Sequence, residues 1–312
     1  ISIYDSKVEL IKNYINNLEE LPEYIIVNSS RTGFAVSAAK EFKIKIIFYI
    51  HEGPDQINIE MNSRNLRYED FVKADFIWNA SKLSINYLLS IDTLNILNKK
   101  LYLLKPFSKY TIESSDRRGK NKIEGILENK PIFGSCGTCC KRKGIDRFLE
   151  LAQNLPMINF VWAGSTYYLD KEFDKVFINE LKEGKNIFLL EHLEDPLTFY
   201  NSIDCLLHLC REDPSPLTSW EASSLRLPQI AFSEDIGNPE TIAKNGMLIY
   251  GKFDLNLLIK IIKNTSIELL RPQIPQRKHM RLRSDFEYDL NNLLSSHDIS
   301  ILPNLLIRKT LP

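Results

Sequence analysis

Ten short apolar runs recur along this chain, and stretches with helical spacing separate them. The runs occupy residues 24–27, 45–50, 76–78, 101–104, 131–135, 158–164, 186–190, 204–210, 228–232 and 247–250. After the fifth run, Ile145, Phe148, Leu149 and Ala152 show the i, i+3, i+4 spacing of an amphipathic helix. Strands that alternate with helices predict βαβ units, so the expected fold class is α/β with mainly parallel sheets.

The composition changes at "IESSDRRGKNKIEGILENKP", a polar and charged segment with Gly and Pro. We interpret it as a linker at residues 112–130, between a first domain at 1–111 and a second at 131–285. A long surface loop within one domain is the alternative. Residues 286–312 lack the strand alternation and are expected to form a helical tail that wraps back over the fold.

The chain starts at Ile1, and no charged-then-apolar signal segment follows it. Only the helical pattern of residues 5–21 precedes the first apolar run. We therefore expect a trimmed chain whose first βα element is missing.

Charge and cysteine content narrow the function classes. Forty basic and forty acidic residues cancel, so no overall field attracts nucleic acid or an anionic membrane. The longest apolar runs fall well short of the roughly 18 residues that a membrane span needs. Five cysteines, an odd number, favour a reducing compartment over a disulfide scaffold. A zinc site is disfavoured, because strand alternation points Cys205 away from His208 and Cys210.

A glycine-containing loop, "GSCGTCCKRKG", follows the fifth run. Gly137 permits a tight turn, the basic triplet 141–143 supplies cations, and Gly144 opens the amphipathic helix. Free N–H groups at a helix start together with a lysine favour a phosphate. The GK[ST] ending of a P-loop is missing, and a solvated basic loop is the alternative.

The segment "REDPSPLTSWEA" follows the eighth run, at the strand end where α/β sheets bind ligands. Pro216 suits the first helical position with Ser215 as N-cap, which would leave the N–H groups of Leu217 and Thr218 free for a second anion. Asp213 in the loop and Glu221 in the second turn could accept hydroxyls of a sugar and a ribose. Alternatively, Asp213 caps the helix and Glu221 makes a surface pair. A single ligand with a diphosphate flanked by hydroxyls would fit both the glycine-containing loop and the segment "REDPSPLTSWEA".

"RKGID-FLELA", "FVWAGS", "DPLTFYNSIDCLLHLCREDPSPLTSWEA" and "GNPETIAKNGMLIY" resemble, in this order, the C-terminal half of retaining family 4 glycosyltransferases. The resemblance covers roughly residues 131–250 and implies the GT-B fold, two Rossmann-like domains with the active site in the cleft. It implies that Lys143 contacts the donor diphosphate, Glu221 the ribose, and the loop from Asp213 the donor sugar. The donor-binding residues so identified are Gly137, Thr138, Arg142, Lys143, Glu212, Pro214, Ser215, Pro216, Leu217, Thr218 and Glu221.

The chain departs from the family pattern at two positions. Asp213 stands where the family has the first glutamate of its Glu-x7-Glu pair, with Glu212 beside it. Thr138 replaces a frequent arginine, and Arg142 either supplies that charge or points into solvent.

The first half carries a fainter resemblance. "FYIHEGP" ends a predicted strand with His51 and Glu52, where related enzymes place a histidine that faces the donor sugar. We therefore group His51 with Asp213 and Lys143 as catalytic residues. The loop "NSSRTGF" after the first run is expected near the acceptor.

The resemblance implies a retaining hexosyltransferase of polysaccharide biosynthesis that needs no cofactor and no metal, in line with the missing D-x-D motif. Its donor would be a UDP- or GDP-linked sugar and its acceptor a glycan or a lipid-linked glycan, in the cytoplasm or at the inner face of the membrane. Two alternatives stay open: a catalytically silent nucleotide-sugar-binding or scaffold protein, and a GT-B nucleotide-sugar 2-epimerase.

Overall fold

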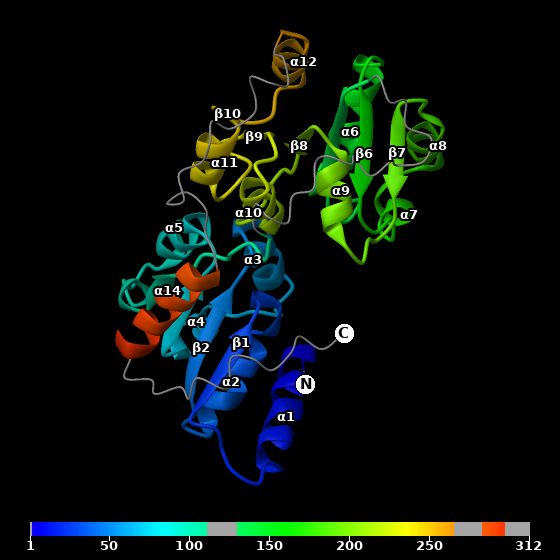
Figure 1. Cartoon of the computed structure of the whole chain (residues 1–312). Coiled ribbons are helices and arrows are strands. Elements are labelled where there is room, and N and C mark those ends of the chain that lie inside the picture. The colour runs from blue at the N-terminus through cyan, green and yellow to red at the C-terminus, as the bar shows by residue number, and fades with distance from the viewer. Residues whose placement is uncertain (1, 111–129, 265–282, 297–312) are drawn as a thin grey trace.

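The structure is a computed structural model that describes residues 2–110, 130–264 and 283–296. Its elements form two domains, each built on a parallel sheet flanked by helices (Figure 1). The predicted linker at 112–130 lies outside the described residues, apart from Lys130.

The first domain contains a four-stranded sheet with the order β1-β2-β3-β4. Its strands are β1 (Tyr24–Asn28), β2 (Lys45–Ile50), β3 (Phe76–Asn79) and β4 (Leu101–Leu103). Its helical elements are α1 (Ile3–Asn16), η1 (Ser30–Thr32), α2 (Phe34–Glu41), α3 (Pro54–Asn62), α4 (Tyr68–Lys73), α5 (Lys82–Ile91) and η2 (Leu97–Lys99). Every strand pair is parallel, so all four strands end at one edge of the sheet.

The second domain contains a six-stranded sheet with the order β10-β9-β8-β5-β6-β7. Its strands are β5 (Ile132–Cys136), β6 (Asn159–Ala163), β7 (Ile187–Leu190), β8 (Cys205–His208), β9 (Gln229–Phe232) and β10 (Met247–Ile249). Its helices are α6 (Ile145–Asn154), α7 (Leu169–Glu172), α8 (Lys175–Glu183), α9 (Pro196–Ser202), α10 (Leu217–Ser224), α11 (Pro239–Asn245) and α12 (Leu255–Asn264). The strand order reverses between β5 and β8, and α/β sheets bind ligands at such a switch point.

All ten predicted strands are confirmed, with bounds that differ by a few residues at most. They are recognisable because a parallel strand is covered by helices on both faces and therefore forms a nearly continuous apolar run. In the second domain, Phe148 of α6 meets Phe160 and Trp162 edge-on, with ring centroids 5.6 and 5.2 Å apart. The apolar spacing of α6 thus serves the packing of this helix on the sheet.

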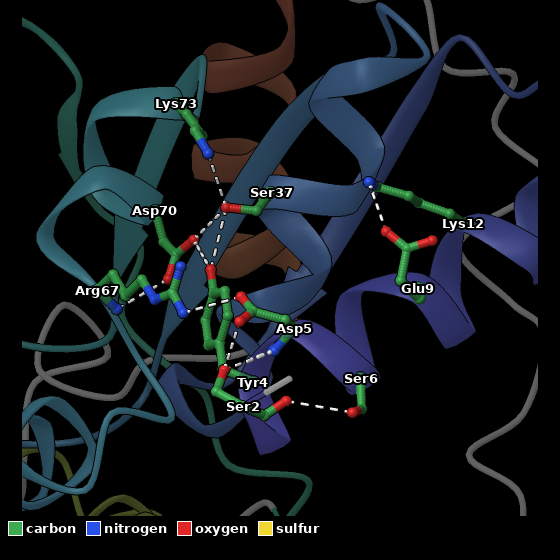
Figure 2. A network of polar contacts seen from close by, with 10 residues as sticks. All are labelled: Ser2, Tyr4, Asp5, Ser6, Glu9, Lys12, Ser37, Arg67, Asp70 and Lys73. Atoms are coloured by element: carbon green, nitrogen blue, oxygen red, sulfur yellow. Dashed lines mark hydrogen bonds and ion pairs between the residues drawn. The ribbon is translucent and has the colours of Figure 1, made fainter.

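A buried polar network anchors α1 to α2 and α4 in the first domain (Figure 2). The Tyr4 hydroxyl donates to the Asp70 carboxylate, and Ser37 Oγ donates to the same oxygen at 2.6 Å. The backbone N–H of Arg67 donates to the other Asp70 oxygen at 2.8 Å. Burial raises the pKa of Asp70, and the hydrogen bonds from Ser37 and Tyr4 oppose that rise. This network fixes α1, which packs against α2.

The helix α14 (Arg283–Ser296) begins three residues before the predicted tail at 286–312, of which residues 297–312 lie outside the described residues. Leu290 and Leu294 pack against Ile47, Trp78 and Leu104 of the first domain. The chain therefore returns from the second domain to cover the first sheet, as expected for this tail (Figure 1). None of the helices in the described part of the chain has both the length and the apolar content that crossing a bilayer requires.

Candidate functional site

Two loops meet at the switch point of the second sheet. One follows β5 and leads into α6, and the other follows β8 and leads into α10. They are bonded to each other, since the N–H of Arg211 donates to the Arg142 carbonyl at 2.8 Å. The Arg142 guanidinium in turn donates to the Glu212 carbonyl at 3.0 Å. The two predicted anion-binding loops are thus one structural unit.

The glycines of the first loop provide space as well as backbone freedom. Gly144, the residue before α6, has a φ of 85°, and a Cβ there would lie 2.0 Å from the Leu209 carbonyl oxygen. Gly137 has a φ of 142°, and the Lys143 side chain crosses it with Cδ and Cε 3.4 Å from the place of a Cβ. The loop can therefore lay Lys143 across its own backbone, toward the second loop.

Lys143 forms an ion pair with Asp213 across the two loops. Asp213 is 8% exposed, and its backbone is held on both sides. Its N–H donates to the Asp235 carbonyl at 3.0 Å, and its carbonyl accepts from the Gly237 N–H at 2.8 Å. Both side chains line a cavity of about 20 Å³ that also reaches Thr218 and His208. Asp213 is not a helix cap, so that alternative is wrong.

The helix α10 begins at Leu217, one residue later than predicted. Pro216 is the N-cap, with a ψ of 122° that keeps it outside the helix, so the assignment of Ser215 as N-cap is wrong. The Ser215 hydroxyl instead accepts from the indole N–H of Trp220 at 3.5 Å. The N–H groups of Leu217 and Thr218 still belong to the first turn, where the helix dipole favours an anion.

Buried polar side chains fix α10 against the sheet. Gln229 Nε2 donates to the Ser219 carbonyl at 3.2 Å and to Ser223 Oγ at 2.9 Å. Gln229 Oε1 must therefore accept from His208, whose Nε2 lies 2.8 Å away and carries the proton. Burial lowers the pKa of His208 to about 4, so the ring is neutral near pH 7. His208 is thus a structural residue next to the Lys143–Asp213 pair.

Glu221 lies in the second turn of α10, as predicted, and is half-buried. The Tyr200 hydroxyl donates to Glu221 Oε2 at 2.5 Å. Burial raises the pKa of Glu221, while the Tyr200 hydrogen bond and the Lys109 charge oppose that rise. A carboxylate held by one fixed donor in a desolvated place is suited to accept hydroxyls of a ligand.

The first domain contributes His51 at the end of β2. The His51 ring lies 4.0 Å from the Tyr49 ring, and its Nε2 is 2.5 Å from Asn28 Oδ1. Burial lowers the pKa of His51, and the neighbouring Glu52 carboxylate opposes that effect. A neutral, oriented imidazole therefore stands at the carboxyl edge of the first sheet.

Glu52 is held as an anion by the loop after β1. Its carboxylate accepts from the Ser29 hydroxyl, from the Ser30 N–H at 2.9 Å and from the His51 N–H at 3.2 Å. Burial alone would raise the pKa of Glu52, but these hydrogen bonds outweigh it and lower the pKa. Ser29 adopts a φ of 101°, a strained conformation for a non-glycine residue. This backbone conformation places the Ser29 hydroxyl against the Glu52 carboxylate and so holds the loop that contains His51.

A cavity of about 350 Å³ lies between the domains. The first domain lines it with Ser29, Arg31, His51, Glu52, Gly53 and Gln56, and the second with Arg142, Glu212, Asp213 and Pro214. The structure thus brings the predicted His51 and Asp213 into one cavity, with Lys143 bonded to Asp213 behind it. Arg142 lines this cavity, where it bonds to the Glu212 carbonyl, and is not among the residues around the smaller cavity next to Lys143.

Another cavity, of about 270 Å³, lies beside the glycine loop. Gly137 and Thr138 line it together with His192, Leu193, Pro196 and Phe199. Its apolar walls and flanking backbone suit a planar ring next to the predicted anion-binding loop. Ser215, Pro216, Leu217 and Glu221 are not among the lining residues of these three cavities, and Leu217 is 52% exposed.

Sequence reasoning placed the loop that contains Ser29 near the acceptor but gave Ser29 itself no role, and it missed Gly53 and Tyr200 as parts of the site. Gly53 follows "FYIHE", so its place after a strand was a usable signal. Nothing in the local sequence marks Tyr200, which reaches Glu221 from α9. The positive φ of Ser29 is likewise a result of tertiary contacts.

The comparisons with known proteins agree with this architecture. The family model described as Glycosyl transferases group 1 matches residues 116–268. One relative, the O-antigen biosynthesis glycosyltransferase WclY of Escherichia coli, is 26% identical over 131 residues, which span 38% of this chain and 36% of the relative. A second Escherichia coli protein of that name is 25% identical over 264 residues, 74% of this chain and 71% of the relative.

Solved structures show the fold. The crystal structure of Anabaena HepE in complex with UDP and glucose matches with a TM-score of 0.66 at 12% identity, over 95% of this chain and 80% of that one. The predicted GT-B fold, with two parallel sheets of four and six strands in the described residues, is confirmed.

Proposed function

Because the chain belongs to the glycosyl transferases group 1 family, we propose that it is a retaining, metal-independent glycosyltransferase. Its donor is a nucleotide-diphosphate sugar, UDP- or GDP-linked, and its acceptor is a glycan or lipid-linked glycan. The observation that carries the proposal is the cavity between the domains, which brings His51 of the first domain opposite Asp213 of the second, with Lys143 bonded to Asp213. O-antigen biosynthesis relatives and a neighbour in complex with UDP support this substrate class.

In the proposed donor complex, the diphosphate lies between Lys143 and the first turn of α10. Negative charge develops on the departing diphosphate, and a fixed cation together with the N–H groups of Leu217 and Thr218 stabilises that charge. Glu221 accepts hydroxyls of the ribose, and the base enters the cavity of about 270 Å³ beside Thr138. This arrangement separates recognition of the nucleoside from the reacting end of the donor.

The transferred sugar occupies the larger cavity. Asp213 accepts a sugar hydroxyl from one side, and His51 contacts the sugar from the other. Departure of the diphosphate and attack by the acceptor hydroxyl occur on the same face of the sugar, so the anomeric configuration is retained. The acceptor enters past Ser29 and Arg31, which line the first-domain side. A cytoplasmic place of action is part of the proposal, supported by five free cysteines in the described residues.

The test is thermal shift and calorimetry with UDP, GDP, ADP and CMP on wild type, Lys143→Ala and Lys141→Ala. Lys141→Ala is the matched control, because it removes the same charge two residues away. The Lys141 side chain is exposed, and its Nζ lies 6.0 Å from the centroid of the Phe173 ring. One nucleotide diphosphate should stabilise wild type and Lys141→Ala but shift Lys143→Ala much less, since stabilisation follows RT ln(1 + [L]/Kd). An equal shift in all three proteins would refute the donor site.

Product analysis then separates the reaction classes. Incubation of the protein with the donor that binds should give slow donor hydrolysis, or sugar transfer when an acceptor is present. Free monosaccharide with a changed configuration at C2 would identify an epimerase instead. Binding without turnover would identify a nucleotide-sugar-binding protein.

A further inference from the structure

The helix α3 of the first domain lacks a cap from its own chain segment. Gly53 is its N-cap residue and offers no side chain to the free N–H groups of the first turn. Such groups are normally satisfied by Ser, Thr, Asp or Asn at this position. Here the acceptor comes from the other domain, because the N–H of Asp55 donates to Glu212 Oε2 at 3.0 Å.

The space for this contact exists because residue 53 is a glycine. A Cβ on Gly53 would lie 2.3 Å from Glu212 Oε1 and 2.6 Å from Glu212 Cδ. The backbone itself does not require glycine, since a φ of −88° and a ψ of 179° are open to any residue. Gly53 is therefore explained by the glutamate that lies against it and not by its own conformation.

Glu212 joins two units that are each rigid on their own. In the second domain, its carbonyl accepts from Arg142, and the next residue, Asp213, is paired with Lys143. In the first domain, the Glu52 carbonyl next to Gly53 accepts from Ser84 Oγ at 2.7 Å. One carboxylate thus connects the loop that carries Lys143 and Asp213 with the loop that carries His51.

A second contact between the domains lies elsewhere. Lys105, just after β4, forms an ion pair with Glu240 of α11. Neither residue lines the cavity of about 350 Å³, whereas Glu212 and Gly53 both do. The Glu212 contact is therefore the one that acts at the cavity wall. Burial raises the pKa of Glu212, and the hydrogen bond from the Asp55 N–H opposes that rise.

We propose that Glu212 is a cross-domain latch: its carboxylate caps α3 and holds the cleft in the arrangement in which His51 faces Asp213, and Gly53 is the gap that admits it. Glu212 is a positioning residue in this scheme and does not contact the reacting atoms. Its consequence for sugar transfer rests on the proposed function, whereas the latch itself does not.

The experiment compares wild type with Glu212→Ala, Glu212→Gln, Gly53→Ala, the double variant Gly53→Ala/Glu212→Ala, and the control Asp55→Ala. Glutamine keeps an oxygen that accepts the Asp55 N–H. The control removes the Asp55 side chain but leaves its N–H, so the latch persists. Hydrogen exchange of the peptide that spans α3, together with small-angle scattering, reports the latch without any ligand. Thermal unfolding confirms that each variant is folded.

Glu212→Ala and Gly53→Ala should each speed exchange at the start of α3 by about ten- to a hundredfold, which corresponds to one charge-assisted hydrogen bond. Both should also increase the radius of gyration. Asp55→Ala should stay within about threefold of wild type, since it keeps the contact. Glu212→Gln should lie between wild type and Glu212→Ala, because a neutral acceptor forms a weaker hydrogen bond than a carboxylate. In the double variant, Gly53→Ala should add nothing to Glu212→Ala, because the clash partner is gone.

Unchanged exchange in Glu212→Ala would overturn the latch, and so would a full additional effect of Gly53→Ala in the absence of the Glu212 side chain. If no nucleotide binds wild type, the proposed function fails, while exchange and scattering still decide on the latch. If both hold, Glu212→Ala should lower kcat/KM for transfer by about tenfold or more, with a smaller loss in Glu212→Gln.

Discussion

The buried imidazole of His208 should make the stability of the protein depend on pH. Burial lowers the pKa of His208 to about 4, from an ordinary value of 6.5. In the unfolded chain the ring takes up a proton as the pH falls through 6.5, whereas in the folded protein it stays neutral down to about 4. The unfolded state therefore binds more protons in this window, and the free energy of unfolding falls as the pH is lowered.

The size of this effect follows from the two pKa values. Between pH 8 and pH 5 the loss of unfolding free energy from this one group is about 2 kcal/mol, and over the whole window it is at most about 3 kcal/mol. That is a measurable part of the roughly 5–15 kcal/mol that stabilises an ordinary domain. Carboxylates also titrate in acid, so the contribution of His208 has to be isolated by a variant.

The variant is His208→Gln, whose amide nitrogen can take the place of Nε2 and donate to Gln229. Chemical denaturation followed by tryptophan fluorescence at pH 8, 7, 6 and 5 gives the unfolding free energy of both proteins. Glutamine does not titrate, so the variant should gain about 2 kcal/mol on wild type between pH 8 and pH 5. Two curves that stay parallel over this range would refute the reasoning, because His208 would then be free to take up a proton in the folded protein.

Three further predictions concern the proposed donor site. Tyr200→Phe should lower the affinity for the nucleotide diphosphate about three- to tenfold, as measured by calorimetry, since it removes the hydrogen bond that orients Glu221. As the pH is lowered, wild type should begin to lose affinity for the same ligand at a pH above the ordinary titration range of a glutamate. The reason is that burial raises the pKa of Glu221 and the protonated acid is a poorer acceptor. Glu221→Gln should bind the ligand weakly at every pH. Asp213→Asn should strengthen binding of the bare nucleotide diphosphate, because Lys143 loses its competing partner, and should reduce the extra affinity of the sugar conjugate. Equal changes for both ligands would argue against a sugar contact by Asp213.

The fold could be predicted because its signals are local. A strand such as β2 is apolar from Ile46 to Ile50 since helices cover both faces of its sheet, and the spacing of α6 follows from packing on one side. The two loops of the proposed donor site could be located for the same reason. Each lies at the carboxyl end of a parallel strand, and the order of the strands brings β5 and β8 together.

The parts that sequence reasoning missed depend on contacts between distant residues. Glu212 and Asp55 are separated by 157 positions, and neither segment indicates the other. The misplaced start of α10 has a local cause that the sequence does not reveal. Pro216 has a φ suited to a first helical residue, but its ψ of 122° leaves it outside, and the Ser215 hydroxyl is engaged by Trp220. Proline restricts φ alone, so the same residue type fits both positions.

The charged groups of the cleft are already paired within the protein, and this bears on how a donor would enter. Lys143 is bonded to Asp213, Glu52 accepts three hydrogen bonds, and Glu212 accepts the Asp55 N–H. A half-buried ion cannot be left unpaired without a cost of a few kcal/mol, so these partners keep the site in shape. A diphosphate carries more negative charge than one carboxylate and therefore competes well for Lys143. In the proposed donor complex, its arrival would release the Asp213 side chain toward the cavity in which we place the sugar. Binding of the proposed leaving group would then prepare the contact with the group to be transferred.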